Sequence, residues 1–398
     1  MEETAAGVRA AAHPHTRTHL APGVNPGQRR RVRLCLAGIA IPLALLTLIG
    51  VVLLWPHTGI EKMPYLEPGS RIAVGTVTKI GTPDKNGQTD VQMKVRGTPV
   101  PVSVPLEVVK NGLSVGDRIK TVFSPNALDT GVPYLFADFC RAGPILILLA
   151  VYLLAVLAVA RKKGLAAIAG LAASVAVVVF FLLPALLAGK PAVLTMLVAG
   201  SAMMFVSIYF AHGISVRTTT AILGTFAGLL LTGVLAWVMI DTANLTGTHG
   251  EAALALVGRL PRLSLQSILL AGMILSGLGA LNDVTVTQVS TVWELHAAAP
   301  QGSRSALIRQ AMTVGRDHIA STVYTLAFAY IGTSLPLLLA ASLIDRGFTD
   351  FLLAGEVAEE IVRTLVASVG LVLAIPLTTV IAAALAPVSP AKQVCRGA

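Results

Sequence analysis

The stretch RRRVRLCLAGIAIPLALLTLIGVVLLW, from Arg29 to Trp55, places four arginines directly before a long apolar run. The run from Leu34 to Trp55 carries no charge and exceeds the roughly 18 residues that indicate a membrane-spanning helix. No small-residue cleavage site follows it, which favours a retained signal anchor over a cleaved signal peptide. We therefore predict a first transmembrane helix over residues 32–55, with its basic start in the cytoplasm.

The rest of the chain continues this apolar character. Of 398 residues, 55% are hydrophobic and 13% are charged, whereas about a quarter of a soluble domain is charged. Seven further apolar runs bring the predicted number of spans to eight; they lie near residues 142–160, 164–188, 191–211, 218–240, 264–282, 318–341 and 362–386. The Lys/Arg excess falls in the segments that this arrangement places inside. The predicted fold class is an α-helical integral membrane protein of about eight transmembrane helices, with both termini cytoplasmic.

Residues 56–140 have a different pattern. RIAVGTVTKI (Arg71–Ile80) alternates in polarity and ends at the turn formers GTPDKNGQ, and further short alternating stretches follow up to Phe123. This predicts a small extracytoplasmic all-β domain between helices 1 and 2, shaped as a partly open barrel. The predicted organisation is a disordered cytoplasmic tail (1–28), the first helix (32–55), the β domain (56–140), a seven-helix domain (141–388) and a cytoplasmic tail (389–398).

Polar residues cluster where one predicted span ends. GLGALNDVTVTQVSTVWEL runs from Gly277 to Leu295, and a helix would place four polar residues of it on one face: Asp283, Thr287, Ser290 and Glu294. Three interpretations stay open. The helix reaches the cytoplasmic boundary near Asp283, or it breaks at Asn282 and Asp283, which then cap a new interfacial helix, or it carries the stripe into the bundle, where charged groups need partners or water.

A second polar cluster begins at the same predicted level. In GRDHIASTVYTLAFAY, helical spacing puts Asp317, Ser321 and Tyr324 on one face, and His318 lies beside them. A histidine here relays protons, binds a metal or simply makes a hydrogen bond. Because no close ligand spacing such as H-x-x-x-H occurs, we expect no metal site and no cofactor. The predicted polar path or gate consists of Asn282, Asp283, Thr287, Ser290, Glu294, Asp317, His318, Ser321 and Tyr324.

Further signals concern helix packing. Glu359 and Glu360 precede Arg363 by four and three residues, which predicts an intrahelical ion pair at the external mouth of the last span. The glycines of GTFAG (Gly224–Gly228) let helices approach closely, either between two copies or, as we favour, within one bundle. Prolines 184, 336 and 376 predict kinks inside spans.

The motifs of common enzymes and of nucleic-acid binding proteins are missing. The sequence contains no H-E-x-x-H, no glycine-rich phosphate loop and no G-x-S-x-G. The net charge of +10 is explained by cytoplasmic loops, since no basic folded domain is present. We therefore expect a non-enzymatic protein that has the lipid bilayer as its partner and binds no nucleic acid.

Four long motifs resemble the YibE/F family of bacterial multi-pass membrane proteins. They are AHGISVRTTTAILGT (211–225), GLGALNDVTVTQVSTVWEL (277–295), GRDHIASTVYTLAFAYIGTSLPLLL (315–339) and GEVAEEIVRTLVASVGLVLAIPLTT (355–379). Tyr324 departs from the family, where an Asn is expected in STVxTL. The resemblance implies a bacterial plasma membrane but supplies no substrate or activity. We expect a transporter or permease of a small solute or ion; the alternative is a membrane scaffold whose external β domain binds a protein partner.

Overall fold

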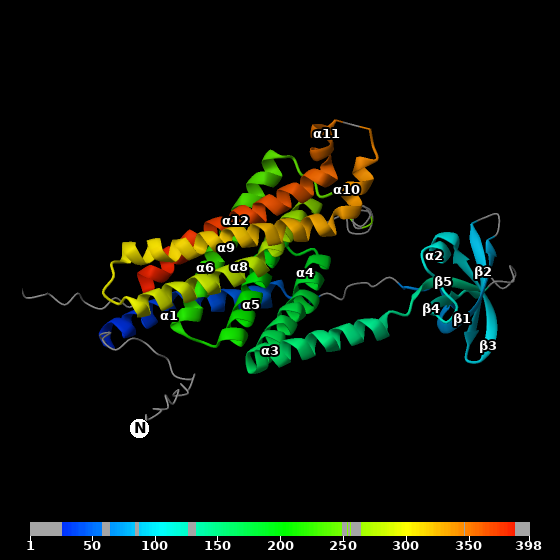
Figure 1. Cartoon of the computed structure of the whole chain (residues 1–398), viewed down its shortest axis with the longest axis horizontal. Helices are drawn as coiled ribbons and strands as arrows, with labels where there is room; N and C mark the ends of the chain where they lie inside the picture. The colour runs from blue at the N-terminus through cyan, green and yellow to red at the C-terminus, as the bar shows by residue number, and fades with distance from the viewer. Residues whose placement is uncertain are drawn as a thin grey trace, which may run out of the picture. The chain divides into compact units, whose positions relative to one another are not determined.

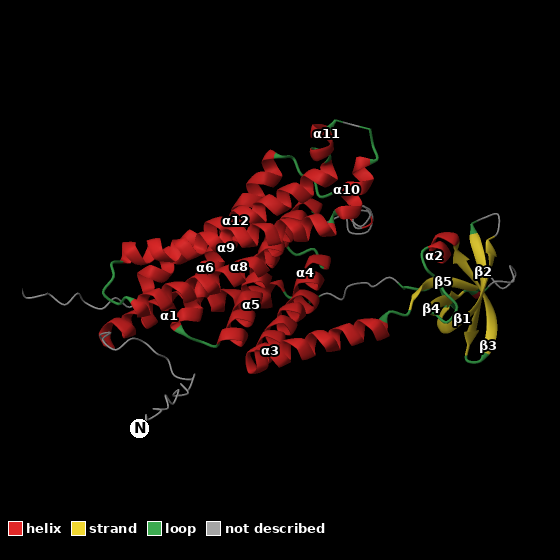
Figure 2. Ribbon diagram, in the orientation of Figure 1, coloured by secondary structure: helices red, strands yellow, loops and turns green. Residues whose placement is uncertain are grey.

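The computed structural model describes residues 26–57, 64–83, 87–125, 133–248, 253, 255, 264–345 and 347–386. Two compact units divide the chain: residues 59–165 form one, and residues 1–58 with 166–398 form the other. The first unit holds all the strands drawn in Figure 2. The predicted tail at 389–398 and residues 1–25 of the predicted N-terminal tail lie outside the described residues, while residues 26–28 already belong to helix α1.

The strands of the first unit close into a barrel. They are β1 (Arg71–Pro83), β2 (Gln88–Val95), β3 (Thr98–Pro105), β4 (Arg118–Phe123) and β5 (Tyr134–Phe139), with the short helix α2 (Leu106–Lys110) after β3. The strand order around the barrel is β1-β2-β3-β5-β4, and only the β3–β5 pair is parallel. This order, with a helix between β3 and β4, is the topology of an OB-fold. The predicted small all-β domain is confirmed, and its barrel is closed.

Alternation along the strands builds the barrel core. Val77, Val91, Val102 and Ile119 point inward and are at most 1% exposed. The β2–β3 hairpin turns at Arg96 and Gly97, whose positive φ angles of 48° and 95° match a type I′ two-residue turn. These local signals explain why the barrel was recognisable from its sequence.

The barrel is joined to the next helix by a two-residue link. The Cys140 N–H donates to the Arg118 carbonyl, 2.9 Å away, which ties the link to β4. Asp138 accepts hydrogen bonds from the Phe139 N–H and from Arg141, and these two donors hold the pKa of its carboxyl below the usual range. The link thus fixes the end of β5 immediately before the apolar helix α3 (Ala142–Val177).

Helix α3 is interrupted at the basic RKK segment. Arg161 leaves the helical conformation, with φ 49° and ψ −128°. A Cβ added to Gly164 would lie 2.7 Å from the Val156 carbonyl oxygen, so the chain after the break packs tightly on the turn before it. The break falls where the sequence predicts a loop between the apolar runs 142–160 and 164–188.

The second unit is helical. Its elements, besides the end of α3, are α1 (Pro26–Leu54), the π-helix η2 (Val178–Leu182), α4 (Leu183–Leu187), α5 (Ala192–His212), α6 (Val216–Thr242), α8 (Leu265–Ala298), α9 (Arg304–Thr333), α10 (Leu335–Ser342), α11 (Phe348–Leu352) and α12 (Gly355–Leu385). Helices α6, α8 and α12 pack against one another, α9 packs on α8 and α12, and α5 packs on α1 and α8 (Figure 1).

Six helical stretches among the described residues are long and apolar enough to cross a membrane, or seven if the bent pair α9–α10 counts as one span. The predicted runs 142–160 and 164–188 share one stretch of 46 residues, Ala142–Leu187. The α9–α10 pair bends by 61° just before Pro336, as the proline predicts. Helix α12, by contrast, continues through Pro376. A multi-pass helical membrane protein is confirmed, and the number of eight spans stays a prediction.

Glycines let the three central helices approach closely. A Cβ added to Gly224 would lie 2.5 Å from Thr378 Oγ1, and one added to Gly228 would lie 2.9 Å from Leu281 Cδ2. The G-x-x-x-G pair of α6 therefore faces α12 and α8 within one chain, as the favoured interpretation predicts. Gly272 of α8, four residues before Ser276, faces open space instead.

Candidate functional site

Helix α8 carries the most distinctive polar segment. It runs without a break from Leu265 to Ala298, and the Ser264 hydroxyl caps its start by accepting from the Ser267 N–H. Its 34 residues correspond to about 51 Å, more than the hydrocarbon core of a bilayer requires. The interpretation in which Asn282 and Asp283 break the helix and cap a new one is therefore wrong.

The predicted polar stripe lies on the outer side of the helical unit. Asp283 and Glu294 are each 74% exposed at the side chain, Thr287 is exposed and Ser290 is half-buried. The opposite side of α8 packs against α6 and α12 and is buried. The stripe thus shares one face, as its spacing predicts, but that face does not point into the bundle.

Two other residues of α8, Thr285 and Gln288, place polar groups inside the bundle. Gln288 is 3% exposed, and its Nε2 donates to the Ala311 carbonyl of α9 at 3.0 Å and to Thr379 Oγ1 of α12 at 2.7 Å. One turn away, the buried hydroxyls of Thr285 and Thr225 form a hydrogen bond between α8 and α6. Four helices are therefore joined by uncharged hydrogen bonds at this level. Thr285 and Gln288 are three residues apart, among valines, and this spacing indicates two polar groups on the buried face of α8. Neither residue was identified from the sequence.

Asp283 and His318 are brought together across α8 and α9. The distance between His318 Nε2 and Asp283 Oδ2 is 4.0 Å, which is too long for a hydrogen bond. Nε2 itself is buried and has no hydrogen-bond partner among the described residues. The imidazole is 29% exposed, and the Thr322 hydroxyl donates to the His318 carbonyl one turn further along α9. A buried ring nitrogen thus faces a carboxylate oxygen across a gap of 4.0 Å, without a hydrogen bond between them.

Asn282 points toward a different neighbour. Its Nδ2 lies 3.4 Å from Ser207 Oγ of α5, and its Oδ1 is buried without a partner in the described part of the chain. Whichever way the amide is turned, one of its two polar atoms stays unpaired. Asn282 and Asp283 therefore place adjacent polar groups on the α5 and α9 sides of one helix.

Glu294 belongs to a separate contact. Arg217 Nη2, at the start of α6, lies 2.6 Å from Glu294 Oε1 and donates to the Ser290 carbonyl at 3.0 Å. The start of α6 is fixed by a capping box between Ser215 and Thr218. This ion pair joins α6 to α8 and occupies the carboxylate.

The remaining predicted residues of the path do not join the Asp283–His318 pair. Asp317, Ser321 and Tyr324 are exposed on α9, and the Tyr324 ring stacks on Phe328. The residues of the predicted polar path are thus divided among separate contacts and an exposed face of α9. Within the described ranges, no three His, Cys, Asp or Glu side chains lie close enough together to hold a metal ion.

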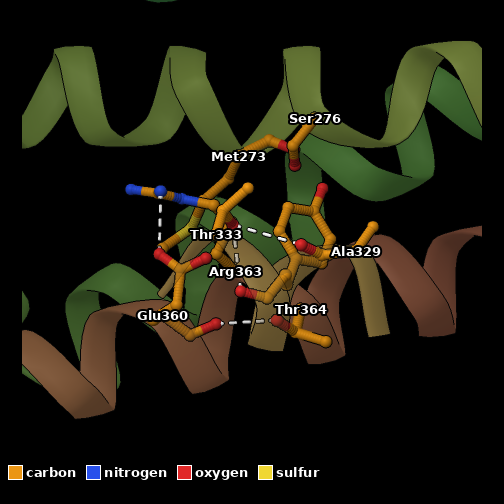
Figure 3. A network of polar contacts seen from close by, with 8 residues as sticks. Met273, Ser276, Ala329, Thr333, Glu360, Arg363 and Thr364 are labelled. Atoms are coloured by element: carbon orange, nitrogen blue, oxygen red, sulfur yellow. Dashed lines mark hydrogen bonds and ion pairs between the residues drawn. The ribbon is translucent and has the colours of Figure 1, made fainter. Parts of the chain in front are cut away.

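Figure 3 shows polar side chains of α8, α9 and α12, whose hydrogen bonds each lie within one helix. Arg363 Nη1 pairs with Glu360 Oε2 at 2.9 Å, as the spacing predicts, and the Thr364 hydroxyl donates to the Glu360 carbonyl. The Thr333 hydroxyl donates to the Ala329 and Tyr330 carbonyls of α9, and the Ser276 hydroxyl donates to the Met273 carbonyl of α8. Glu359 is 7% exposed and accepts a hydrogen bond from the Gly247 N–H at 2.9 Å. The Glu359 contact ties the start of α12 to the loop that follows α6.

Comparison with known proteins adds one match. The family model described as YibE/F-like protein matches residues 148–388, which include most of α3 and every later helix but not the barrel. No curated protein and no solved structure matches the chain.

Proposed function

We propose that this chain, which belongs to the YibE/F-like protein family, is a transporter that moves a small solute or ion across the plasma membrane. The proposal assigns no enzymatic step to the protein. Both termini would lie in the cytoplasm and the barrel outside, an orientation supported by the arginines before α1 and by the RKK segment at 161–163.

One observation carries the proposal: two buried polar atoms, on the α5 and the α9 sides of α8, have no hydrogen-bond partner among the described residues. They are one amide atom of Asn282 and Nε2 of His318, next to the Asp283 carboxylate. Leaving a buried polar group unpaired costs about 1–3 kcal/mol, and such groups usually find a partner in water, an ion or a ligand. A solute that binds between the helices would supply the missing hydrogen-bond partner, which is why these atoms support a transport function.

Replacing Asp283 with Asn should abolish transport while the protein still inserts and folds, because the change removes the carboxylate charge but keeps the side-chain size. Candidate solutes are first identified with wild-type protein by thermal shift, using Na⁺, K⁺, Mg²⁺, Zn²⁺, phosphate and free amino acids. A ligand at about 100 times its Kd raises the free energy of unfolding by about 2.7 kcal/mol. Uptake of each hit is then measured in proteoliposomes.

Asp317→Asn is the matched control for that experiment. It removes the same charge from an exposed position on α9, one residue before His318, and we expect wild-type uptake. If Asp283→Asn protein is inserted normally and transports as well as wild type, the role of Asp283 in transport is wrong.

A second function is favoured by the outer surface of the barrel. Ile72 and Leu135 are 50% and 45% exposed, and both are paired with Val122 of the intervening strand β4. Val74 continues this apolar row along β1. Such a row suits the binding of a protein partner outside the membrane, so the protein would act as a scaffold.

The scaffold function predicts that the double variant Ile72→Ser, Leu135→Ser no longer captures a protein partner in cells, whereas the Asp283→Asn variant still does. The barrel should still fold, because both side chains point outward; resistance to limited proteolysis checks this. The opposite result, with no change in the double variant and with transport lost in the Asp283 variant, supports transport and excludes a barrel partner.

A further inference from the structure

We infer that the gap between Asp283 of α8 and His318 of α9 binds a divalent transition-metal ion, with Zn²⁺ as the representative. Binding is a property of these two helices alone. That such an ion is also the solute carried across the membrane rests on the transport function proposed above.

The distance across the gap fits one bridging ion. Zn²⁺ lies about 2.0–2.1 Å from a histidine nitrogen and about 2.0–2.2 Å from a carboxylate oxygen. Two such ligands on one ion are therefore at most about 4.3 Å apart, and His318 Nε2 and Asp283 Oδ2 are 4.0 Å apart. A small rotation of the exposed Asp283 carboxylate brings the pair to the shorter separation of a tetrahedral site.

The chemistry of the two donors selects the class of ion. Imidazole nitrogen is a ligand of Zn²⁺, Cu²⁺, Ni²⁺ and Fe²⁺, whereas Mg²⁺ and Ca²⁺ take oxygen ligands. The nitrogen in question is buried and unpaired within the described chain, so no protein hydrogen bond has to be broken before it binds. A gap between a free imidazole nitrogen and a carboxylate therefore suits a transition metal better than an alkali or alkaline-earth ion.

No third His, Cys, Asp or Glu of the described residues joins this pair, so ligands from outside the protein would fill the other coordination positions. The Asp283 side chain is 74% exposed, which leaves its side of the pair accessible to such ligands. Sites that keep an open position exchange their ligands, whereas structural zinc sites are closed by four protein ligands. Two protein ligands thus indicate a site that binds and releases its ion.

Charged neighbours compete little for this ion or for its ligands. Glu294 is occupied by Arg217, and Arg316 and Asp317 are exposed on α9. Helix α12, which packs on both α8 and α9, has no titratable side chain between Thr364 and Leu385. Metal sites of helical bundles are built from side chains on facing helices in this way.

The test uses the full-length, untagged chain in nanodiscs, with His13, His15 and His19 replaced by Ala so that the N-terminal histidines bind no metal. Zn²⁺ binding is measured by calorimetry and Co²⁺ coordination by visible absorption. We expect saturable binding that is weakened at least tenfold in both His318→Gln and Asp283→Asn. Asp317→Asn and Thr287→Ala should bind as the parent does, and the nitrogen-dependent Co²⁺ bands should be lost only in His318→Gln.

Three results overturn the inference. They are no saturable Zn²⁺ binding by the parent, Zn²⁺ binding by the His318 or Asp283 variant that is as tight as the parent's, and a loss of affinity in the Asp317 control as large as in those two variants. Zn²⁺ uptake into proteoliposomes, followed with a trapped fluorescent indicator, separates this inference from the proposed function. Binding that depends on both residues without any uptake supports the site and overturns transport of this ion. Uptake that neither site variant alters supports transport and overturns the site.

Discussion

Replacing Gly370 with leucine should prevent the helical unit from folding, and replacement with alanine should already lower its free energy of unfolding by about 1–3 kcal/mol. A Cβ at Gly370 of α12 would overlap Thr232 Oγ1 of α6. Thr232 is fully buried and donates to the Gly228 carbonyl at 2.9 Å, so its side chain has nowhere to move. Thermal unfolding of the purified protein in detergent measures the loss, and size-exclusion chromatography detects aggregation of the leucine variant.

The chain provides a control and a rescue for this prediction. Gly272→Ala adds the same methyl group at a position of α8 that faces open space, and it should leave the unfolding temperature within error. Thr232→Ala removes the obstructing hydroxyl, so the double variant with Gly370→Ala should recover most of the loss. If alanine at 370 and alanine at 272 have equal effects, the close approach of α6 and α12 is wrong.

The second large effect is expected at Gln288. Gln288→Met keeps the side-chain length but removes the amide that donates to Ala311 and Thr379. It should lower the free energy of unfolding by about 0.6–2 kcal/mol, the range for such hydrogen bonds in model peptides and helical membrane bundles. Gln288→Glu should cost more, because an ionised carboxylate would be buried against the Ala311 carbonyl without a donor. Chemical unfolding in mixed micelles gives both values.

Thr287→Ala is the control. Thr287 is exposed, and among the described residues it forms no hydrogen bond to another helix. A surface change of this kind stays within about 0.5 kcal/mol. Equal losses at positions 287 and 288 would contradict the assignment of the inward face of α8.

The helices and the barrel were predictable because their signals are local. Apolar runs define the spans, and alternation in RIAVGTVTKI defines β1. Closure of the barrel was not predictable, since it depends on pairing between β3 and β5, which are separated by α2, β4 and their loops. The break at Arg161 falls in the basic segment where the sequence predicts a loop. This break alone does not fix the number of spans.

The site was predicted in part. Helical spacing correctly grouped Asp283, Thr287 and Glu294 on one face, but spacing does not show which face is inward. The sequence therefore left open whether the charged face serves the interior, and the structure buries Thr285 and Gln288 there instead. The partner of Glu294 is Arg217, 77 residues away, and only the packing of α6 on α8 brings the two together.

The Arg217–Glu294 pair has a consequence for the local stability of the contact between α6 and α8. Arg217 and Glu294 are 37% and 74% exposed, so their attraction is screened by salt, whose Debye length falls from about 10 Å at 0.1 M to about 3 Å at 1 M. The hydroxyl contact between Thr225 and Thr285, two turns further along α6, carries no charge and is fully buried. We therefore expect rising ionic strength to weaken the α6–α8 contact at its Arg217 end first, so that the amide hydrogens of the last turns of α8 exchange with solvent before those of its centre.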